Sequence, residues 1–162
     1  MVKSRKQLRE WLCLRNVIDF PPLWTVLIIV IGIVLSRYTI PLSLHFPLIL
    51  MLGIVLAGLS FSLMIWCALT LVKSKTPALP HNKAETLVTK GPYRWSRNPI
   101  YLADIVLLIS FAFIYKTLWP ILLVPLLYWI LQKRFVLPEE NMLKEHFAEA
   151  FSSWAQRARR WI

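Results

Sequence analysis

The stretch LVTKGPYRWSRNPIYLA, residues 87–103, places basic side chains, a Gly-Pro step and an Asn-Pro step in an otherwise apolar chain. Glycine and proline at this density predict turns and irregular backbone rather than a continuous helix. A new apolar run begins within the stretch, at Asn98, and extends to Tyr115. The stretch therefore divides the chain into two apolar halves, and its role depends on which runs cross a membrane.

The chain of 162 residues is 57% hydrophobic, which is too apolar for an ordinary soluble domain of this size. A membrane-spanning helix needs about 20 residues, with roughly 17–25 observed. Four runs without lysine or arginine are candidates: Phe20 to Ser36, Tyr38 to Val72, Asn98 to Tyr115 and Thr117 to Gln132. They predict an all-α polytopic membrane protein with about four transmembrane helices, the last two forming a hairpin. Pro120 and Pro125 predict kinks in the fourth.

The basic residues are distributed as the positive-inside rule requires for four spans with both termini cytoplasmic. The formal net charge is +11, and of the 19 lysines and arginines only Arg37 and Lys116 fall in the two connections on the opposite side. Topology, with attraction to anionic lipid, accounts for the charge, so no nucleic-acid partner is predicted. No cleavable signal peptide is evident, and a prokaryotic inner membrane is the simplest location. The sequence does not indicate the oligomeric state.

We expect a single membrane-embedded domain over residues 1–162. Its parts are an interfacial helix (1–19), the first two spans (20–72), a cytoplasmic loop (73–98), a helical hairpin (99–136) and an amphipathic cytoplasmic helix (137–162). The last helix is predicted from Pro138, which suits a helix start, and from apolar residues that recur every three or four positions through Ala158 and Trp161. Cys13 and Cys67 suggest neither a disulfide nor a metal site.

Polar side chains gather at the cytoplasmic ends of the predicted hairpin. Glu139 and Glu140 follow the fourth span, and Arg94, Arg97, Asn98 and Tyr101 precede or begin the third. Because the two spans form a hairpin, both groups lie on the same side at similar depth, where a zwitterionic ligand with a ribose would find partners. Adjacent glutamates on a helix point to different faces, so they do not predict a catalytic dyad.

Asp104 is the acidic residue inside a predicted span. Ionisable residues at such positions are costly and tend to be functional. It is either a polar ligand near the cytoplasmic mouth or, more simply, the partner of a basic residue in the neighbouring loop.

The stretch LVTKGPYRWSRNPIYLA, followed one hairpin later by RFVLPEENMLKEHFAEAFSSWAQRARRW, resembles the isoprenylcysteine carboxyl methyltransferase and phospholipid methyltransferase superfamily of integral membrane enzymes. The family pattern is Gly-Pro-Tyr, then Arg-His/Asn-Pro-x-Tyr-Leu-Gly, a hairpin, Glu-Glu-x-x-Leu and an aromatic tail. It falls on residues 91–93, 97–102, 139–143 and 151–161, which belong to the C-terminal half. The chain departs from the pattern at Asn98, where many members have His, at Ala103 and Ala148, where Gly is usual, and at Phe151 and Trp154, where Tyr is common.

The resemblance implies S-adenosylmethionine bound on the cytoplasmic side, without the Rossmann glycine fingerprint of soluble methyltransferases. The implied cofactor-binding residues are Val88, Thr89, Lys90, Gly91, Pro92, Tyr93, Arg97, Asn98, Pro99, Tyr101, Leu102, Glu139 and Glu140. Arg134, which would reach an acidic group of the substrate, and Glu139 are the expected catalytic residues. No metal is expected.

The resulting hypothesis is an S-adenosylmethionine-dependent methyltransferase that acts on a carboxylate, amine or thiol of a lipophilic, membrane-dissolved acceptor. A sterol-type membrane reductase using NADPH resembles the chain at the Arg-Asn-Pro-x-Tyr step, but 162 residues are few for that fold and the glutamate pair fits it less well. A non-catalytic scaffold or lipid-binding protein would explain the spans and the basic ends. It leaves the two linked motifs unexplained.

Overall fold

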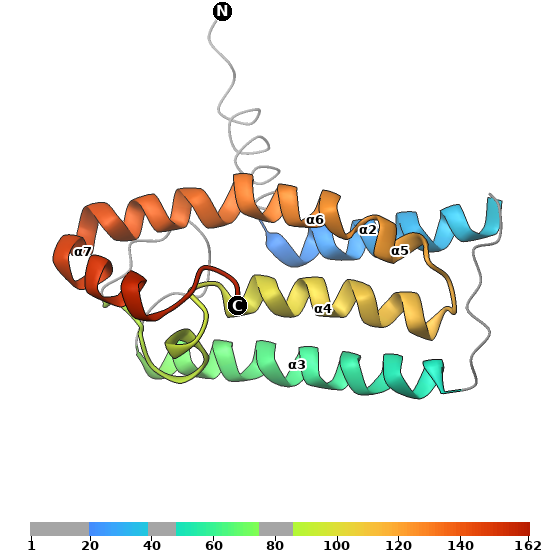
Figure 1. Cartoon of the computed structure of the whole chain (residues 1–162), viewed down its shortest axis with the longest axis horizontal. Coiled ribbons are helices and arrows are strands. Elements are labelled where there is room, and N and C mark those ends of the chain that lie inside the picture. Colours follow the sequence, from blue (N-terminus) through green and yellow to red (C-terminus); the bar gives the residue numbers. More distant parts are fainter. Residues whose placement is uncertain (1–19, 39–47, 75–85) are drawn as a thin grey trace, which may run out of the picture.

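The computed structural model describes residues 20–38, 48–74 and 86–162 of the chain (Figure 1). These residues are helical and contain no strand, so the all-α prediction is confirmed. The helices are α2 (Pro21–Tyr38), α3 (Ile49–Lys73), η1 (Gly91–Arg94), α4 (Pro99–Ile114), α5 (Trp119–Leu122), α6 (Val124–Leu131), the π-helical segment η2 (Gln132–Val136) and α7 (Leu137–Arg157). The predicted interfacial helix over 1–19 and residues 75–85 of the predicted loop lie outside the described residues.

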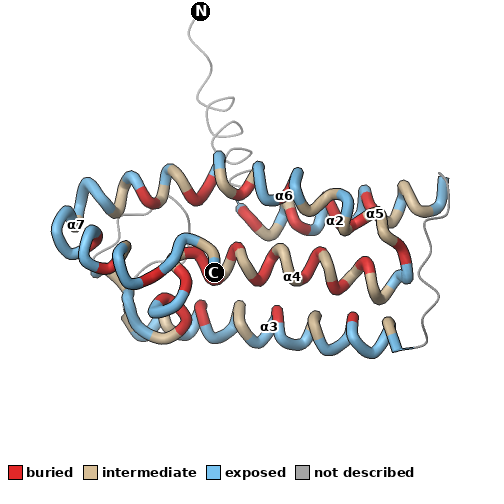
Figure 2. The backbone as a smooth tube through the Cα atoms, in the orientation of Figure 1, coloured by how far each residue is buried: buried red, intermediate tan, exposed pale blue. Residues whose placement is uncertain are grey.

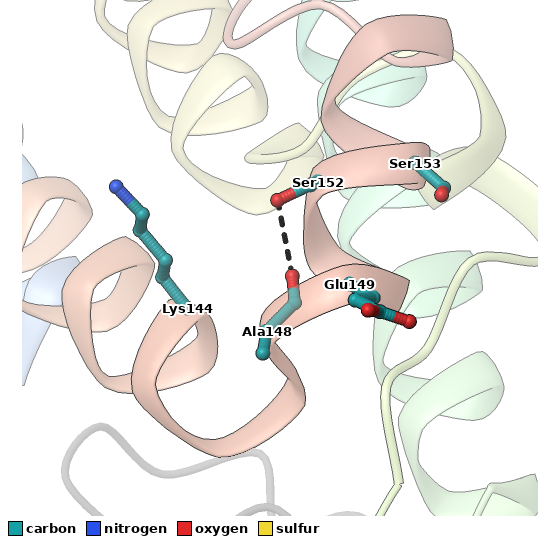
Figure 3. Close-up of a pocket in the computed structure, with 5 residues that line it drawn as sticks. All are labelled: Lys144, Ala148, Glu149, Ser152 and Ser153. Atoms are coloured by element: carbon teal, nitrogen blue, oxygen red, sulfur yellow. Dashed lines mark hydrogen bonds between the residues drawn. The ribbon is translucent and has the colours of Figure 1, made fainter.

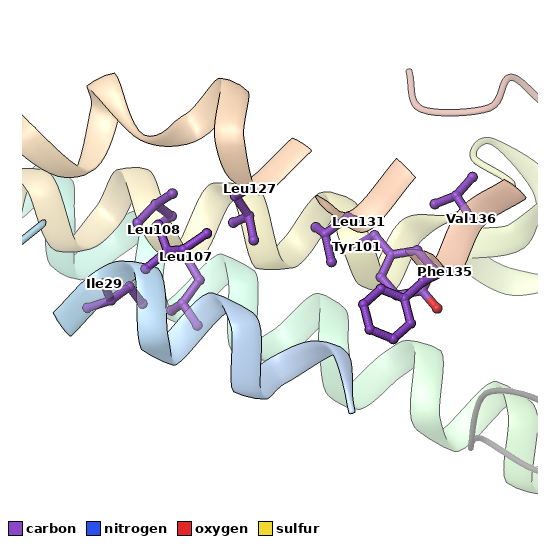
Figure 4. Close-up of a cluster of buried hydrophobic side chains, with 9 residues drawn as sticks. Ile29, Tyr101, Leu107, Leu108, Leu127, Leu131, Phe135 and Val136 are labelled. Atoms are coloured by element: carbon purple, nitrogen blue, oxygen red, sulfur yellow. The ribbon is translucent and has the colours of Figure 1, made fainter. Parts of the chain in front are cut away.

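Helix α4 is the centre of the bundle, because it packs against α2, α3, α5 and α6. In Figure 1 it runs between α3 and the layer formed by α2, α5 and α6. The main core gathers where these helices meet (Figure 4), and its fully buried members include Ile28, Leu108, Leu127, Leu131 and Phe135. Burial of large aliphatic and aromatic side chains around α4 thus fixes the position of the helix that carries most of the Arg-Asn-Pro-x-Tyr motif.

Helices α2 and α3 are long and apolar enough to cross a membrane. Most of their surface is exposed, as Figure 2 shows for α3, whose buried residues are Gly53, Ser60 and Cys67. Its outward side chains are large and apolar, among them Met51, Ile54, Val55, Leu59 and Ile65. A soluble monomer rarely exposes so continuous an apolar surface, whereas a bilayer covers it without penalty. The membrane prediction is therefore supported by where the apolar side chains point.

The third and fourth predicted spans are shorter than the first two. Helix α4 has 16 residues, and the run from Thr117 to Gln132 is broken into α5 and α6 at Leu123. Pro120 and Pro125 lie in the first turn of each piece, where a missing N–H is tolerated. The expected kink is confirmed. Within the described part of the chain, two helices rather than four reach full spanning length.

The junction between α6 and α7 differs from the prediction that a new helix starts at Pro138. The chain continues from α6 through the π-helical segment η2 into α7, and Val136 and Leu137 keep helical backbone angles. Proline cannot donate the next backbone hydrogen bond, and the wider π turn just before it accommodates that loss. The helical ribbon therefore runs without a break from the bundle into α7 (Figure 1).

Helix α7 is kinked at Ala148, whose φ of 26° is positive, and it ends at Arg157. The prediction that helical periodicity continues through Ala158 and Trp161 is wrong. Ala158 is extended, with φ −104° and ψ 128°, because the residues that follow pair with the backbone of the loop before α4. We call residues 158–162 the C-terminal segment.

Candidate functional site

The Gly-Pro-Tyr part of the motif forms the short helix η1, which rests directly on α3. Gly91 has φ +60°, and a Cβ added there would lie 3.0 Å from the Thr70 hydroxyl oxygen. Both the backbone conformation and the close approach require glycine. Trp95 at the end of η1 meets Trp66 of α3 edge to face, with ring centroids 5.9 Å apart. Glycine is required at this position because the loop lies too close to α3 for a side chain.

The C-terminal segment returns to this loop and pairs with its backbone. The Arg97 N–H donates to the Arg159 carbonyl at 2.8 Å, and the Arg159 N–H donates to the Trp95 carbonyl at 3.2 Å. The Asn98 side-chain amide donates to the Arg160 carbonyl at 3.0 Å. Segments about sixty residues apart are therefore joined as a short parallel bridge. Asn98, predicted to bind the cofactor, uses its amide for this contact.

Glu140 is the ionic anchor of the C-terminal segment. The Arg160 Nε donates to both carboxylate oxygens, at 3.1 and 3.0 Å, and its Nη2 lies 2.7 Å from Oε2. The Arg97 Nη1 lies 3.5 Å from Oε1 of the same carboxylate. Hydrogen bonding to Glu140 raises the pKa of Arg160 above its ordinary value. Glu140 is buried, so its charge is balanced by two guanidinium groups.

Glu139 faces a different partner. The Tyr101 hydroxyl donates to Glu139 Oε1 at 2.8 Å. Burial raises the pKa of Glu139 to about 7, and the hydrogen bond from Tyr101 opposes part of that rise. The two adjacent glutamates thus point to different neighbours, as their positions on a helix predict. Glu140 forms ion pairs with two arginines, whereas Glu139 forms none with a described residue and has a pKa near neutral pH.

Arg97 pairs with Glu140 and keeps one buried N–H without a partner in the described residues. Its Nη1 faces Glu140, its guanidinium lies 6.0 Å from the centre of the Phe151 ring, and its Nε is buried without a hydrogen-bond partner in the described residues. An unpaired buried donor on a charged group is costly unless a ligand completes it. The site therefore offers one unpaired N–H donor of the Arg97 guanidinium, next to the ion pair between Arg97 and Glu140.

The remaining predicted cofactor residues fall into two groups. Pro92, Tyr93 and Pro99 are buried, and Val88 is half-buried, whereas Thr89 and Lys90 are exposed. Burial raises the pKa of Tyr93 above its ordinary range. Its backbone carbonyl accepts a hydrogen bond from the Trp154 indole at 2.9 Å, and the ring packs in a cluster with Cys67 and Phe151. Leu102 donates its backbone N–H to the Asn98 carbonyl in the first turn of α4.

Arg134 belongs to the π segment η2. Its guanidinium stands 5.3 Å from the ring centre of Trp24 on α2. The side chain is exposed. The structure therefore places the Arg134 guanidinium against α2, the first described helix.

Two polar residues in the helical bundle were not singled out from the sequence. Thr25, on α2, is buried with a hydroxyl that has no hydrogen-bond partner in the described residues, and both Asp104 oxygens share that condition. The expected pairing of Asp104 with a basic loop residue is not found among them. A lone threonine inside an apolar run carries no pattern that would have identified it. Gln132 is the other, and it accepts a hydrogen bond from the Trp161 indole at 3.0 Å.

A separate hollow lies at the kink of α7. It has a volume of about 560 Å³ and is lined by Lys144, Ala148, Glu149, Ser152 and Ser153 (Figure 3). These residues are exposed, and the Ser152 hydroxyl donates to the Ala148 carbonyl at 3.1 Å. The hollow is an open surface feature of the kink. No group of three or more potential metal ligands occurs in the parts of the chain that the structure describes.

Comparison with known proteins identifies a family for most of the chain. The family model for phospholipid methyltransferases matches residues 48–150, which include α3, the loop, the hairpin and most of α7. The cobalt-zinc-cadmium resistance protein CzcN of Cupriavidus metallidurans is 28% identical over 114 residues, which are 70% of this chain and 47% of that protein. The chain thus spans about half the length of this curated relative. No solved structure matches the chain. Because the family match covers well over half of the residues and includes the loop, Tyr101 and both glutamates, the chain belongs to the phospholipid methyltransferase family.

Proposed function

We propose that the protein transfers a methyl group from S-adenosylmethionine to a lipophilic acceptor dissolved in the membrane. The observation that carries the proposal is the meeting of Arg97, Tyr101 and the glutamate pair at the start of α4. The buried Arg97 Nε is unpaired in the described residues, and the Glu139 carboxyl is paired there with Tyr101. A donor and an acceptor of opposite charge at one place suit the two ends of an amino acid.

The residues present fit the amino-acid part of this cofactor. The Arg97 guanidinium would hold its carboxylate, and the N-terminus of the 16-residue helix α4 favours a negative charge at the same place. Glu139 would face the ammonium group, whose positive charge favours the ionised form of a carboxyl with a pKa of about 7. Glu140 acts indirectly, since its two oxygens already accept hydrogen bonds from Arg160. When bound, the cofactor supplies a methyl group on a sulfonium.

Methyl transfer of this kind needs alignment and exclusion of water more than a covalent enzyme intermediate. The second half of α7 and the C-terminal segment cover the loop, with Phe151, Trp154 and Ala158 buried against it. They would keep water from the reacting atoms. The apolar sides of α2 and α3 would keep a lipophilic acceptor in the bilayer, and the exposed Arg134 beside α2 would meet an acidic group of that acceptor.

We further propose that the loop and both chain ends face the cytoplasm of a prokaryotic inner membrane. The distribution of lysine and arginine supports this orientation, because all but Arg37 and Lys116 lie on one side of the predicted spans. Accessibility labelling of single cysteines introduced at Lys116 and Lys144 in intact cells tests the orientation. Labelling of Lys116→Cys alone by an impermeant reagent is expected, and the opposite pattern would reverse the topology.

Transfer of labelled methyl groups from S-adenosylmethionine to a total membrane lipid extract tests the activity. The wild type should label a lipid, and Arg97→Lys, which keeps the charge but removes the Nε donor, should lose most of that transfer. Arg94→Lys is the matched control, because Arg94 is an exposed arginine of the same loop. Equal transfer by both variants would remove Arg97 from the site. A folded wild type that binds NADPH but not S-adenosylmethionine would favour the reductase, and one that binds neither would favour a scaffold.

A further inference from the structure

A pair of exposed tryptophans connects the apolar surface of α3 with the loop that precedes α4. Trp66 of α3 is 45% exposed, and Trp95, which meets it edge to face from the end of η1, is 65% exposed. The backbone of Trp95 is held on both sides, because its N–H donates to the Pro92 carbonyl and its carbonyl accepts a hydrogen bond from the Arg159 N–H. The exposure of the Trp95 ring is therefore built into the loop.

The loop lies beside the last turns of α3 rather than beyond its end. Gly91 of η1 approaches Thr70, which precedes the last residue of α3, Lys73, by three residues. At 1.5 Å per residue, the contact is roughly 5 Å from the end of the helix. The exposed surface of α3 is still apolar past this contact, since Val72 is 70% exposed. A bilayer that covers the apolar surface of α3 therefore reaches the level of Trp95.

The loop beside the tryptophans is basic. Lys90 and Arg94 directly precede Gly91 and Trp95 in the chain, and both side chains are exposed. Neither forms an ion pair with a described residue. No acidic residue occurs in α3 or in residues 86–98, which are the described part of the loop. Two cationic side chains without a counter-ion in the described residues thus lie next to two exposed indole rings.

This combination fits the headgroup of an anionic phospholipid. Indole rings favour the level of the lipid headgroups, where the ring meets apolar groups and the N–H meets water or lipid oxygens. Basic side chains at the same level attract anionic lipid. A zwitterionic lipid gives the indoles the same surroundings but brings no net negative charge to the cations. An acidic soluble protein brings the charge but does not cover the apolar side chains of α3 beside the indoles.

We propose that the two tryptophans, together with Lys90 and Arg94, form a docking surface for an anionic phospholipid that is not itself methylated. The lipid phosphate accepts hydrogen bonds from the ammonium and guanidinium groups. The indole rings lie at the level of the glycerol backbone, and the acyl chains run along exposed apolar side chains of α3 such as Ile65. The docked lipid holds the loop at the membrane surface. This inference does not rest on the proposed methyl transfer.

The first experiment is thermal unfolding of the protein in neutral detergent during titration with dihexanoylphosphatidylglycerol, beside dihexanoylphosphatidylcholine and glycerol phosphate. A ligand that binds the folded state raises the melting temperature in proportion to the logarithm of its concentration over Kd. The wild type should bind the anionic lipid at least about tenfold more tightly than the zwitterionic lipid, and glycerol phosphate should cause no shift. Each variant is compared with the same variant without lipid, so that its own stability does not enter the result.

Removal of the charges should weaken binding of the anionic lipid stepwise. Arg94→Gln should bind it about fivefold more weakly, the factor that corresponds to the attraction of one basic side chain to an anionic lipid surface, and the double variant with Lys90→Gln roughly twentyfold more weakly. Lys144→Gln is the matched control, because it removes an exposed cation of α7. Equal affinity of the wild type for the two lipids, equal effects of Arg94→Gln and Lys144→Gln, or a shift caused by glycerol phosphate would overturn the proposal.

Fluorescence quenching in vesicles locates the docked lipid. Two vesicle preparations have the same mixture of phosphatidylglycerol and phosphatidylcholine, with bromine on the acyl chains of one lipid or of the other. Tryptophan fluorescence of the wild type should be quenched more by the brominated phosphatidylglycerol. That excess should disappear in the double variant Trp66→Phe and Trp95→Phe, whose other tryptophans remain. Equal quenching of the wild type in both preparations, or an excess that survives in the double variant, would contradict a docking surface at these two residues.

Discussion

Glu140 should matter more for holding the C-terminal segment than for touching a ligand. Its carboxylate accepts hydrogen bonds from Arg160 Nε at 3.1 and 3.0 Å and lies 2.7 Å from Nη2, with Arg97 at 3.5 Å. The Glu140 side chain is 9% exposed, whereas that of Arg160 is 42% exposed. Glu140→Ala would therefore release one partly exposed arginine and leave Arg97 without its anion.

The magnitude follows from burial. A hydrogen bond to a charged group contributes about 1.5–3 kcal/mol, and exposure of Arg160 places its share near the lower end. Adding the loss at the half-buried Arg97, we expect Glu140→Ala to lower the free energy of unfolding by about 2–3 kcal/mol. Glu149→Ala, an exposed glutamate of the same helix, should change it by less than about 0.5 kcal/mol.

A double-mutant cycle isolates the contact. Unfolding in mixed detergent is measured for Glu140→Ala, Arg160→Ala and the double variant, and a coupling of about 1–2 kcal/mol is expected between the two sites. Trypsin should also cleave within residues 157–160 faster in Glu140→Ala than in Glu149→Ala. Strictly additive effects, or a C-terminal segment equally resistant in both variants, would refute the assignment of Glu140 as its anchor.

Three further outcomes follow from local geometry. Gly91→Ala should lower the unfolding free energy by about 1–2 kcal/mol, because alanine is strained at φ +60° and its Cβ would meet Thr70; thermal unfolding checks this. Ala148→Gly should raise it by about 0.5–1 kcal/mol, because glycine relieves the strain at φ 26° and loses part of that gain to backbone entropy; an unchanged or lower melting temperature would count against the kink. The raised pKa of Glu139 favours the folded state while the carboxyl is protonated, so stability should fall as pH rises from 4.5 through about 7. In Glu139→Gln that fall should be smaller, as melting temperatures across this window would show.

The sequence predicts the helical class and the two long apolar helices well, because the runs that form α2 and α3 are uninterrupted by charge. It also predicts the break in the fourth run, since Pro120 and Pro125 act locally on the backbone. It does not predict that Pro138 continues a helix. That outcome depends on the π turn of η2, which is stabilised by packing of Phe135 and Val136 in the core rather than by a local signal.

The sequence predicts only in part how the contacts of Glu139 and Glu140 differ. Adjacent positions on a helix predict different directions, which the contacts to Tyr101 and Arg160 confirm. Which glutamate pairs with Arg160 depends on where the C-terminal segment returns. That return is a long-range pairing of residue 159 with residues 95–97, and the apolar periodicity through Trp161 favours a longer helix instead. Tertiary contact overrides the local pattern here.

The structure shows the backbone conformation or the surroundings of two residues that depart from the family pattern. Ala148 stands where glycine is usual, and its positive φ explains why glycine suits that position. Ala103 also replaces a glycine, yet it is fully buried beneath Ser60, which donates to its carbonyl. Thr25 could not be identified from sequence, because its proximity to Asp104 joins two helices that are far apart in the chain.

Calorimetric titration with S-adenosylmethionine, on detergent-purified wild type beside Arg97→Lys and Arg94→Lys, tests whether a cofactor site lies at the start of α4. Wild type and Arg94→Lys should bind saturably, and Arg97→Lys, which lacks the Nε donor, should bind at least about tenfold more weakly. No binding by a folded wild type, or equal affinity in all three proteins, would contradict a cofactor site at the start of α4.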